Sequence, residues 1–287
     1  MDSETILSLD DVTVCAVDTI NPLAAARALD CSMSQCKFGD AILFTHNAVS
    51  TRARFIKIGE LRSIHDYSAF VIKQIVHHII TPWVLIVQWD GYVVDASQWH
   101  EEFRAFDYIG ARWIKGDNGI LVGNGGFSLR SARLLAALAD DRLVVPPNAV
   151  EDVLICRIWR AFLEQEYNIR VAPIEVANRF SYEHTVPENR TFGFHGINNM
   201  WRHVDQVAMS EIIRGLDMRT LSTAGSLVAL VNYCALRQFT CAKALYDRYR
   251  SCYSAAELVD LLVDTARVGT NIDRDAARRY VETCERL

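Results

Sequence analysis

The apolar run WVLIV at residues 83–87 constrains the fold of this chain more than any other segment. It follows Pro82, contains no polar position, and leads directly into Gln88, Trp89, Asp90 and Gly91. Strands that are apolar on both sides are typical of sheets covered by helices on both faces, and such sheets are mostly parallel. The run therefore predicts a central strand of an α/β domain.

The segments before this run alternate between strand and helix patterns. Strands are predicted at residues 12–17, 41–45 and 54–58. Asn21 as N-cap and Pro22 in the first helical position predict an Ala-rich helix between the first two strands. Such a βαβ unit should have a right-handed crossover. Apolar spacing of three and four predicts a further helix at 66–80.

Shorter segments follow, with helices predicted at 99–106, from Ser131 onward and at 151–165, and extended chain at 108–111 and 169–173. Beyond about residue 204, Gly and Pro become scarce and helical spacing dominates. We therefore expect two parts. Residues 1–204 form a Rossmann-like mixed, mostly parallel sheet flanked by helices, and residues 205–287 form an all-helical region.

Composition excludes several classes of protein. The chain is 51% hydrophobic and 23% charged with a formal net charge of −5, which indicates a globular protein and not a basic nucleic-acid binder. The eight cysteines form no CxxC pair and are expected to be reduced. The first residues lack the basic start of a signal peptide, and the central apolar run is too short to span a bilayer. We expect a cytoplasmic protein whose membrane contact, if any, is peripheral.

Two features near the predicted strands could carry chemistry. Asp90 follows the buried strand and precedes a glycine. A carboxylate at this position could bind a hard divalent cation, or it could only stabilise a turn. In GNGGFSLRS, Asn124, Gly125 and Gly126 would allow a ligand close to the backbone, or a tight turn into a helix. This segment is neither a phosphate-binding GK[ST] loop nor a GxGxxG fingerprint, since Ser128 occupies the last glycine position.

Two later features are equally open to a structural interpretation. Glu151 and Asp152 begin a predicted helix, where they could favour the helix dipole or supply a general base. His195 lies between aromatic residues and glycines in FGFHG, and it could be a metal ligand or a hydrogen-bonded core histidine.

In this order, the features resemble the GT-A class of nucleotide-sugar glycosyltransferases. The motifs QWDGYV, FDYIGARW, VGNGGFSLRS, EDVLICR and FGFHG resemble a glycosyltransferase-like domain family over about residues 12–200, with a looser likeness to the Fringe and core-1 type β-1,3-glycosyltransferases. The resemblance implies a GT-A fold. It also implies transfer, with inversion, from a nucleoside-diphosphate sugar, in particular a UDP-sugar, to a hydroxyl of a glycan or other acceptor. The cofactor would be Mn²⁺ or Mg²⁺, and the pathway polysaccharide or glycoconjugate biosynthesis.

The resemblance also implies roles for the main residues. Asp90 and His195 would hold the metal, Asp152 would be the general base, and Glu151 would support it. Gln88 departs from the family pattern, because it replaces the first acid of an Asp-x-Asp motif and makes weak metal binding or metal independence an option. Arg112 departs too, because it stands where a proline is expected.

Further residues are secondary candidates for contact with the nucleotide-sugar donor. The backbone at Asn124, Gly125 and Gly126 would face the donor diphosphate. The other candidates, with the nucleotide, phosphate or sugar as their partner, are Asp18, Thr19, Lys73, Trp89 and Arg130.

Two other functions compete with transfer. A non-catalytic module could recognise a nucleotide sugar or glycan and use its helices to bind a partner. A nucleotidyltransferase would need a Gly-rich basic loop after the first strand, which VDTINPLAAAR lacks. A homodimer through the C-terminal helices is a further expectation.

Overall fold

The structure is a computed structural model that describes residues 6–114, 121–265 and 272–287. It divides into two compact units, Met1–His195 and Gly196–Leu287. The boundary predicted at residue 204 lies a short way inside the second unit. The two units are described separately below.

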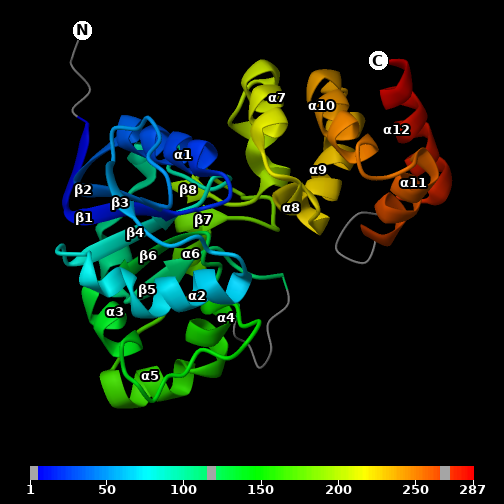
Figure 1. Cartoon of the computed structure of the whole chain (residues 1–287). Coiled ribbons are helices and arrows are strands. Elements are labelled where there is room, and N and C mark those ends of the chain that lie inside the picture. The colour runs from blue at the N-terminus through cyan, green and yellow to red at the C-terminus, as the bar shows by residue number, and fades with distance from the viewer. Residues whose placement is uncertain (1–5, 115–120, 266–271) are drawn as a thin grey trace, which may run out of the picture. The chain divides into compact units, whose positions relative to one another are not determined.

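The first unit is built on a six-stranded sheet in the order β3-β2-β1-β4-β6-β5 (Figure 1). Neighbouring strands are parallel from β3 to β4, whereas β6 is antiparallel to both β4 and β5. The prediction of an α/β fold with a mostly parallel sheet is confirmed. The strands are β1 (Leu7–Val17), β2 (Cys36–Thr45), β3 (Arg54–Lys57), β4 (Trp83–Val87), β5 (Tyr108–Gly110) and β6 (Phe127–Ser131).

Helices cover both faces of this sheet, with α1 on one side and α2 and α3 on the other (Figure 1). The side chains of β4 alternate between the two cores. Leu85 packs in the core that contains α1, and Ile86 packs in the core that contains α2. An apolar run without polar positions is required because both faces of β4 are buried. The helices of this unit are α1 (Pro22–Gln35), α2 (Ile64–Lys73), α3 (Ala132–Leu138), α4 (Glu151–Val153), α5 (Arg160–Tyr167) and α6 (Ile174–Phe180).

Several predicted elements differ from the structure. The helix expected at 66–80 ends at Lys73 and continues as a 3-10 turn, because the β-branched residues that follow and Pro82 disfavour a regular helix. The segment 99–106 contains a 3-10 turn, Glu101–Ala105, and no α-helix. The helix expected at 151–165 is interrupted by a π-turn, Leu154–Ile158. The predicted strand at 169–173 is reduced to one bridge between Val171 and Tyr108.

A two-stranded parallel pair, β7 (Ser181–Tyr182) and β8 (Gly193–Phe194), completes the first unit. An isolated bridge joins Val93 to Gly193. The segment after β4 is therefore in register with the chain that leads to His195.

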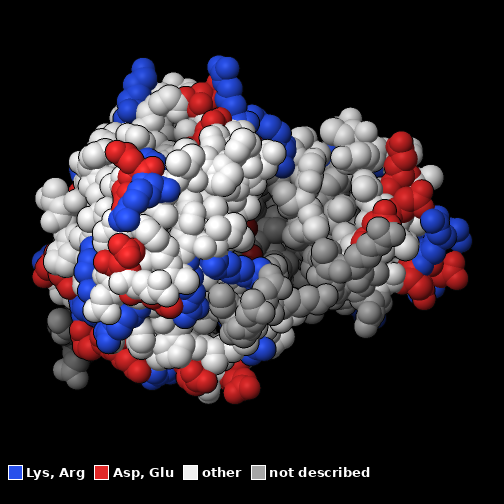
Figure 2. All heavy atoms as spheres, turned by 90° about the horizontal axis from the view of Figure 1, so that it is seen from below, with Lys and Arg blue, Asp and Glu red and all other residues white. Residues whose placement is uncertain are grey.

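The second unit is helical in its described residues, as predicted. Most of its helices begin at acidic or hydroxyl N-caps, although α10 begins after Gln238, which makes no side-chain capping bond. Ser254 and Glu257, for example, form a capping box at the start of α11. The helices are α7 (Gln206–Gly215), α8 (Met218–Leu221), α9 (Ala224–Ala235), α10 (Phe239–Arg250), α11 (Ala255–Asp264) and α12 (Arg274–Arg286). Across the described ranges, no helix combines the length and apolar character that crossing a bilayer requires. Figure 2 shows Lys and Arg interspersed with Asp and Glu on the face that it presents.

Candidate functional site

The predicted motifs meet at the carboxyl end of β4. Gln88 and Gly91 exchange two backbone hydrogen bonds of 3.1 and 3.0 Å, and this tight turn carries the buried Asp90. Because β6 is antiparallel to β4, the residues that precede β6, Gly125 and Gly126, lie at the same edge of the sheet. Sheet topology alone therefore brings the first two motifs together.

His195 joins this turn through its Nε2 atom. Nε2 lies 3.1 Å from Oε1 of Gln88 and 3.5 Å from Oδ1 of Asp90. The side-chain amide of Gln88 in turn donates a hydrogen bond of 2.9 Å to the hydroxyl of Tyr67. Asp90 and His195, which the family resemblance assigns to one site, are thus neighbours in space.

Glu183 occupies the other side of the imidazole, and sequence reasoning missed it. Its Oε1 lies 2.9 Å from Nδ1 of His195, and its Oε2 accepts a hydrogen bond of 2.7 Å from the side-chain amide of Asn124. His184 contacts the same carboxylate at 3.0 Å. The local sequence, SYEHTVPENR, reads as an ordinary polar loop, and its acid–histidine pair was the one available signal.

The charges in this cluster support one another. Burial would lower the pKa of His195, but the carboxylates of Asp90 and Glu183 outweigh it and raise that pKa well above its usual range. Burial would likewise raise the pKa of Glu183, but the charge of His195 outweighs it and lowers that pKa. The cluster therefore contains an imidazolium between two carboxylates.

The glycines allow the motifs to approach this closely. A Cβ atom on Gly126 would lie 2.1 Å from Nε2 of His195, and one on Gly125 would lie 2.1 Å from Oε1 of Glu151. A Cβ on Gly91 would lie 2.8 Å from the His195 ring. No side chain fits at these distances, so the Gly-rich segment packs directly on the histidine and the acidic pair.

Glu151 is engaged with Arg130, and both side chains are buried. Nη2 of Arg130 donates to Oε1 of Glu151 at 2.9 Å, and Nε donates to the hydroxyl of Ser128 at 3.0 Å. The guanidinium also lies over the ring of Tyr108, 5.1 Å from its centre. Nη1 of Arg130 is buried without a hydrogen-bond partner among the described residues.

Asp152 points its carboxyl group toward the glycine turn. Its Oδ2 accepts a hydrogen bond of 3.1 Å from the backbone N–H of Gly125. Its Oδ1 is buried and has no hydrogen-bond partner in the part of the chain that the structure describes. Burial, assisted by the neighbouring charge of Glu151, raises the pKa of Asp152 to about 7. This carboxyl group can therefore exchange a proton near neutral pH.

Asp18 and Thr19 follow β1, the strand next to β4. Oδ1 of Asp18 accepts hydrogen bonds from the backbone N–H groups of Ile20 and Asn21, at 2.7 and 2.6 Å. Burial raises the pKa of Asp18, and the charge of Asp90 adds to this effect. The hydroxyl of Thr19 accepts a hydrogen bond of 2.9 Å from the backbone of Leu61.

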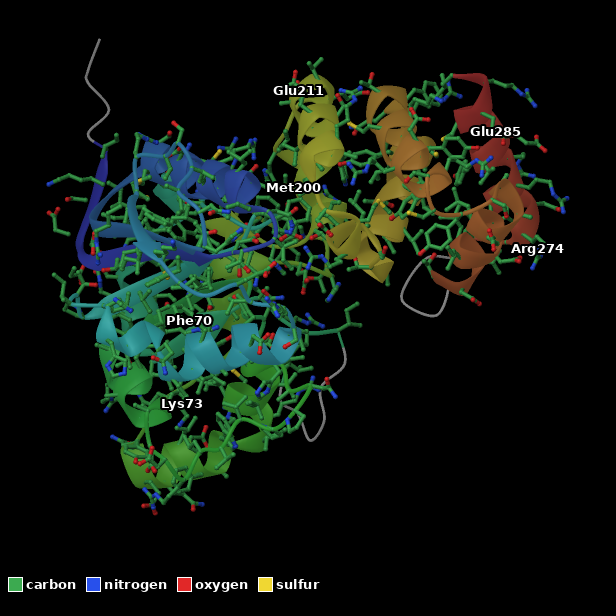
Figure 3. All side chains as sticks on the ribbon, viewed as in Figure 1. Phe70, Lys73, Met200, Glu211, Arg274 and Glu285 are labelled. Carbon is green, nitrogen blue, oxygen red and sulfur yellow. The ribbon has the colours of Figure 1, made fainter. Side chains whose placement is uncertain are left out.

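Lys73 and Trp89 are placed differently from the main cluster. Nζ of Lys73, on α2, donates to the carbonyls of Leu138 and Asp140 at 2.7 Å each, so this lysine caps the end of α3 (Figure 3). The structure does not bring it to the cluster. Trp89 lies in the turn after β4 and is partly exposed.

Candidate metal donors are few. In residues 6–114, 121–265 and 272–287, no group of three or more His, Cys, Asp or Glu side chains is arranged to hold a metal ion. Asp90 and His195 supply two potential donor side chains, and the amide oxygen of Gln88 lies beside them.

Comparison with known proteins identifies one family. A family model described as "Protein of unknown function (DUF5672)" matches residues 50–195. No curated protein matches the sequence. The matched range begins just before β3 and ends at His195, so it contains Asp90, the glycine turn, Asp152 and Glu183.

Proposed function

Because the chain belongs to the DUF5672 family, whose description names no activity, we propose a function from the cluster itself. It is an inverting glycosyltransferase that moves a sugar from a nucleoside-diphosphate sugar to a hydroxyl group. The observation that carries this proposal is the carboxyl group of Asp152, with a pKa of about 7, one oxygen held by Gly125 and the other buried without a partner among the described residues.

Asp152 has the properties that a general base requires. In an inverting displacement, the base takes the proton of the acceptor hydroxyl while that oxygen attacks the anomeric carbon. The bond from the anomeric carbon to the diphosphate breaks, and the nucleoside diphosphate leaves with the electron pair. A carboxylate works best as a base when its pKa is close to the working pH, and Oδ1 of Asp152 is available to accept the proton.

The position of the cluster supports a nucleotide-sugar donor. The strand order reverses between β1 and β4, and ligands of open α/β sheets bind beyond the carboxyl ends of the strands at such a point. Asp18 follows β1, and Gln88 and Asp90 follow β4. This arrangement, together with the resemblance of the motifs, is our reason to propose a GT-A fold.

The residues around His195 fit a divalent cation. The ring nitrogen of a metal-binding imidazole that does not contact the metal commonly forms a hydrogen bond with a carboxylate. Nδ1 of His195 is placed in this way, 2.9 Å from Oε1 of Glu183. To bind a cation, His195 would release the proton from Nε2, and that nitrogen would then act beside the oxygens of Asp90 and Gln88, which are donor types that Mn²⁺ accepts. When bound, such an ion would offset charge on the departing diphosphate. Arg130 holds Glu151, whose charge helps to raise the pKa of Asp152, although the charge of Arg130 itself acts in the opposite direction.

A binding module without turnover is the second candidate. It is favoured by the contacts of His195, because both ring nitrogens already lie within 3.1 Å of protein oxygens. The cluster is therefore structurally complete with the chain's own side chains, as a recognition site can be.

Turnover separates the two candidates. The full chain is incubated with UDP-, GDP- and dTDP-sugars and Mn²⁺, and released nucleoside diphosphate is measured from pH 6 to pH 8.5. We expect slow release by hydrolysis with one donor class, with a rate that rises as pH passes about 7 and Asp152 ionises. Binding of a donor without release would favour the binding module, and neither binding nor release with any donor would contradict both.

A further inference from the structure

A second site lies at the opposite end of the same two strands. An open pocket of about 380 Å³ is lined by Trp83, the first residue of β4, and by Ser131, the last residue of β6. Since β4 has five residues, the pocket is about 15 Å from the Asp90 cluster at a rise of roughly 3.3 Å per residue. Its lining also includes Phe106 and the arginines Arg104, Arg133 and Arg170. It takes no part in the proposed sugar transfer.

Asp107 organises the polar wall of this pocket. It accepts hydrogen bonds from the hydroxyl of Ser131 at 2.6 Å, from Nε of Arg133 at 3.1 Å and from the backbone N–H of Arg170 at 2.9 Å. Burial would raise its pKa, but the hydrogen bonds from Arg133 and Ser131 outweigh it and lower that pKa. The carboxylate is thus ionised and fully engaged, and it fixes the places of two arginines.

The three arginines differ in whether they already pair with a carboxylate of the chain. Arg104 pairs with Asp11 and Glu101, and Arg133 pairs with Asp107 through Nε and Nη2. Arg170 has no carboxylate partner among the described residues, since its Nη2 donates to a backbone carbonyl and its guanidinium lies 5.6 Å from the ring centre of Phe106. Nη1 of Arg133 and the Nε and Nη1 groups of Arg170 therefore remain as donors to a ligand.

We propose that this pocket binds a small phosphate monoester. Arg133 and Arg170 donate to the phosphate oxygens, and the rings of Trp83 and Phe106 pack against the organic group. Guanidinium groups match the geometry of phosphate oxygens and keep their charge at every physiological pH. The volume is at the lower end of the range for small-molecule sites, which suits a ligand of one ring and one phosphate.

Calorimetric titration of the full chain with phenyl phosphate tests this proposal. We expect saturable binding at millimolar or lower concentration, weaker binding of inorganic phosphate and none of phenol. Arg170→Gln should weaken the affinity for phenyl phosphate about tenfold, as the loss of a hydrogen bond to a charged group does. This variant keeps the backbone N–H of residue 170, which donates a hydrogen bond to Asp107, so the pocket wall stays in place.

Arg278→Gln is the matched control, because Arg278 is an exposed arginine of α12. It should bind phenyl phosphate as the unchanged chain does. Asp90→Asn should also leave this affinity unchanged, so failure here is distinguishable from failure of the proposed transferase function. The proposal is overturned if phenyl phosphate gives no saturable heat, if Arg170→Gln binds it equally well, or if phenol binds with the same affinity.

Discussion

Replacement of Asp152 by Asn is expected to abolish sugar transfer while making the protein more stable at pH 7.5. Asparagine can still accept the hydrogen bond from the N–H of Gly125, but it cannot take a proton from the acceptor. We expect the rate of transfer to fall about 10³-fold with little change in donor affinity, because the base acts on the acceptor.

The stability gain follows from the direction of the pKa shift. The carboxyl group of Asp152 has a pKa raised from 3.8 to about 7, so the folded protein holds a proton that the unfolded chain has released between these values. Stability is therefore lost as pH rises from about 4 to about 7, and it stays lower above that. Asp152→Asn removes this loss, with an expected gain of up to about 4 kcal/mol at pH 7.5 and little at pH 4.

Thermal denaturation at both pH values, alongside assays of transfer and donor binding, measures both effects. Asp141→Asn is the control, since Asp141 is exposed, and it should change neither quantity. If Asp152→Asn transfers sugar at a near-normal rate, the base is another residue. If it is no more stable than the unchanged chain at pH 7.5, the raised pKa is wrong.

Replacement of Arg130 by Met is expected to cost about 3–5 kcal/mol of folding free energy. Methionine fills a similar volume, but it leaves the buried carboxylate of Glu151 without the guanidinium that lies 2.9 Å away. An unpaired buried charge is far more costly than the loss of an exposed ion pair, which is typically worth about 0–1 kcal/mol.

Urea denaturation of three variants separates the charge effect from packing. Arg130→Met should be strongly destabilised, the double variant Arg130→Met with Glu151→Gln should recover much of the loss, and Arg278→Met on α12 should be nearly neutral. A single variant as stable as Arg278→Met, or a double variant no better than the single one, would contradict the role of the buried pair.

The central elements of the fold could be predicted because local signals and burial agree there. The run WVLIV forms β4, because an apolar segment without polar residues suits a strand that is buried on both faces. Pro22 begins α1, because proline is favoured in the first position of a helix. The interruptions of the later helices could not be predicted. The π-turn at Leu154–Ile158 depends on a hydrogen bond from the N–H of Trp159 to the carbonyl of Leu154, which no residue pattern announces.

The candidate site was predictable where a residue follows a strand or a glycine turn. Asp90, Gly125, Asp152 and His195 are brought together, since β4 and β6 run in opposite directions and present their motifs at one edge. Glu183 was missed because its role comes from tertiary contacts with His195 and Asn124.

Two other residues assigned from the sequence to the nucleotide-sugar donor, Lys73 and Arg130, bind groups of the chain itself. Lys73 caps α3, and only the fold decides which carbonyls a lysine reaches. Arg130 holds Glu151 in the core, and its Nη1 is the atom without a partner among the described residues. A homodimer through the C-terminal helices stays a prediction.

Donor binding tests the central claim most directly. The full chain and Asp90→Asn are titrated calorimetrically with UDP-, GDP- and dTDP-sugars, each with and without Mn²⁺. The account predicts that one class of donor binds to the unchanged chain, that Mn²⁺ strengthens this binding, and that Asp90→Asn weakens it about tenfold while Asp141→Asn does not. Binding of no donor, or binding that Asp90→Asn leaves unchanged, would contradict the assignment of this cluster as a nucleotide-sugar site.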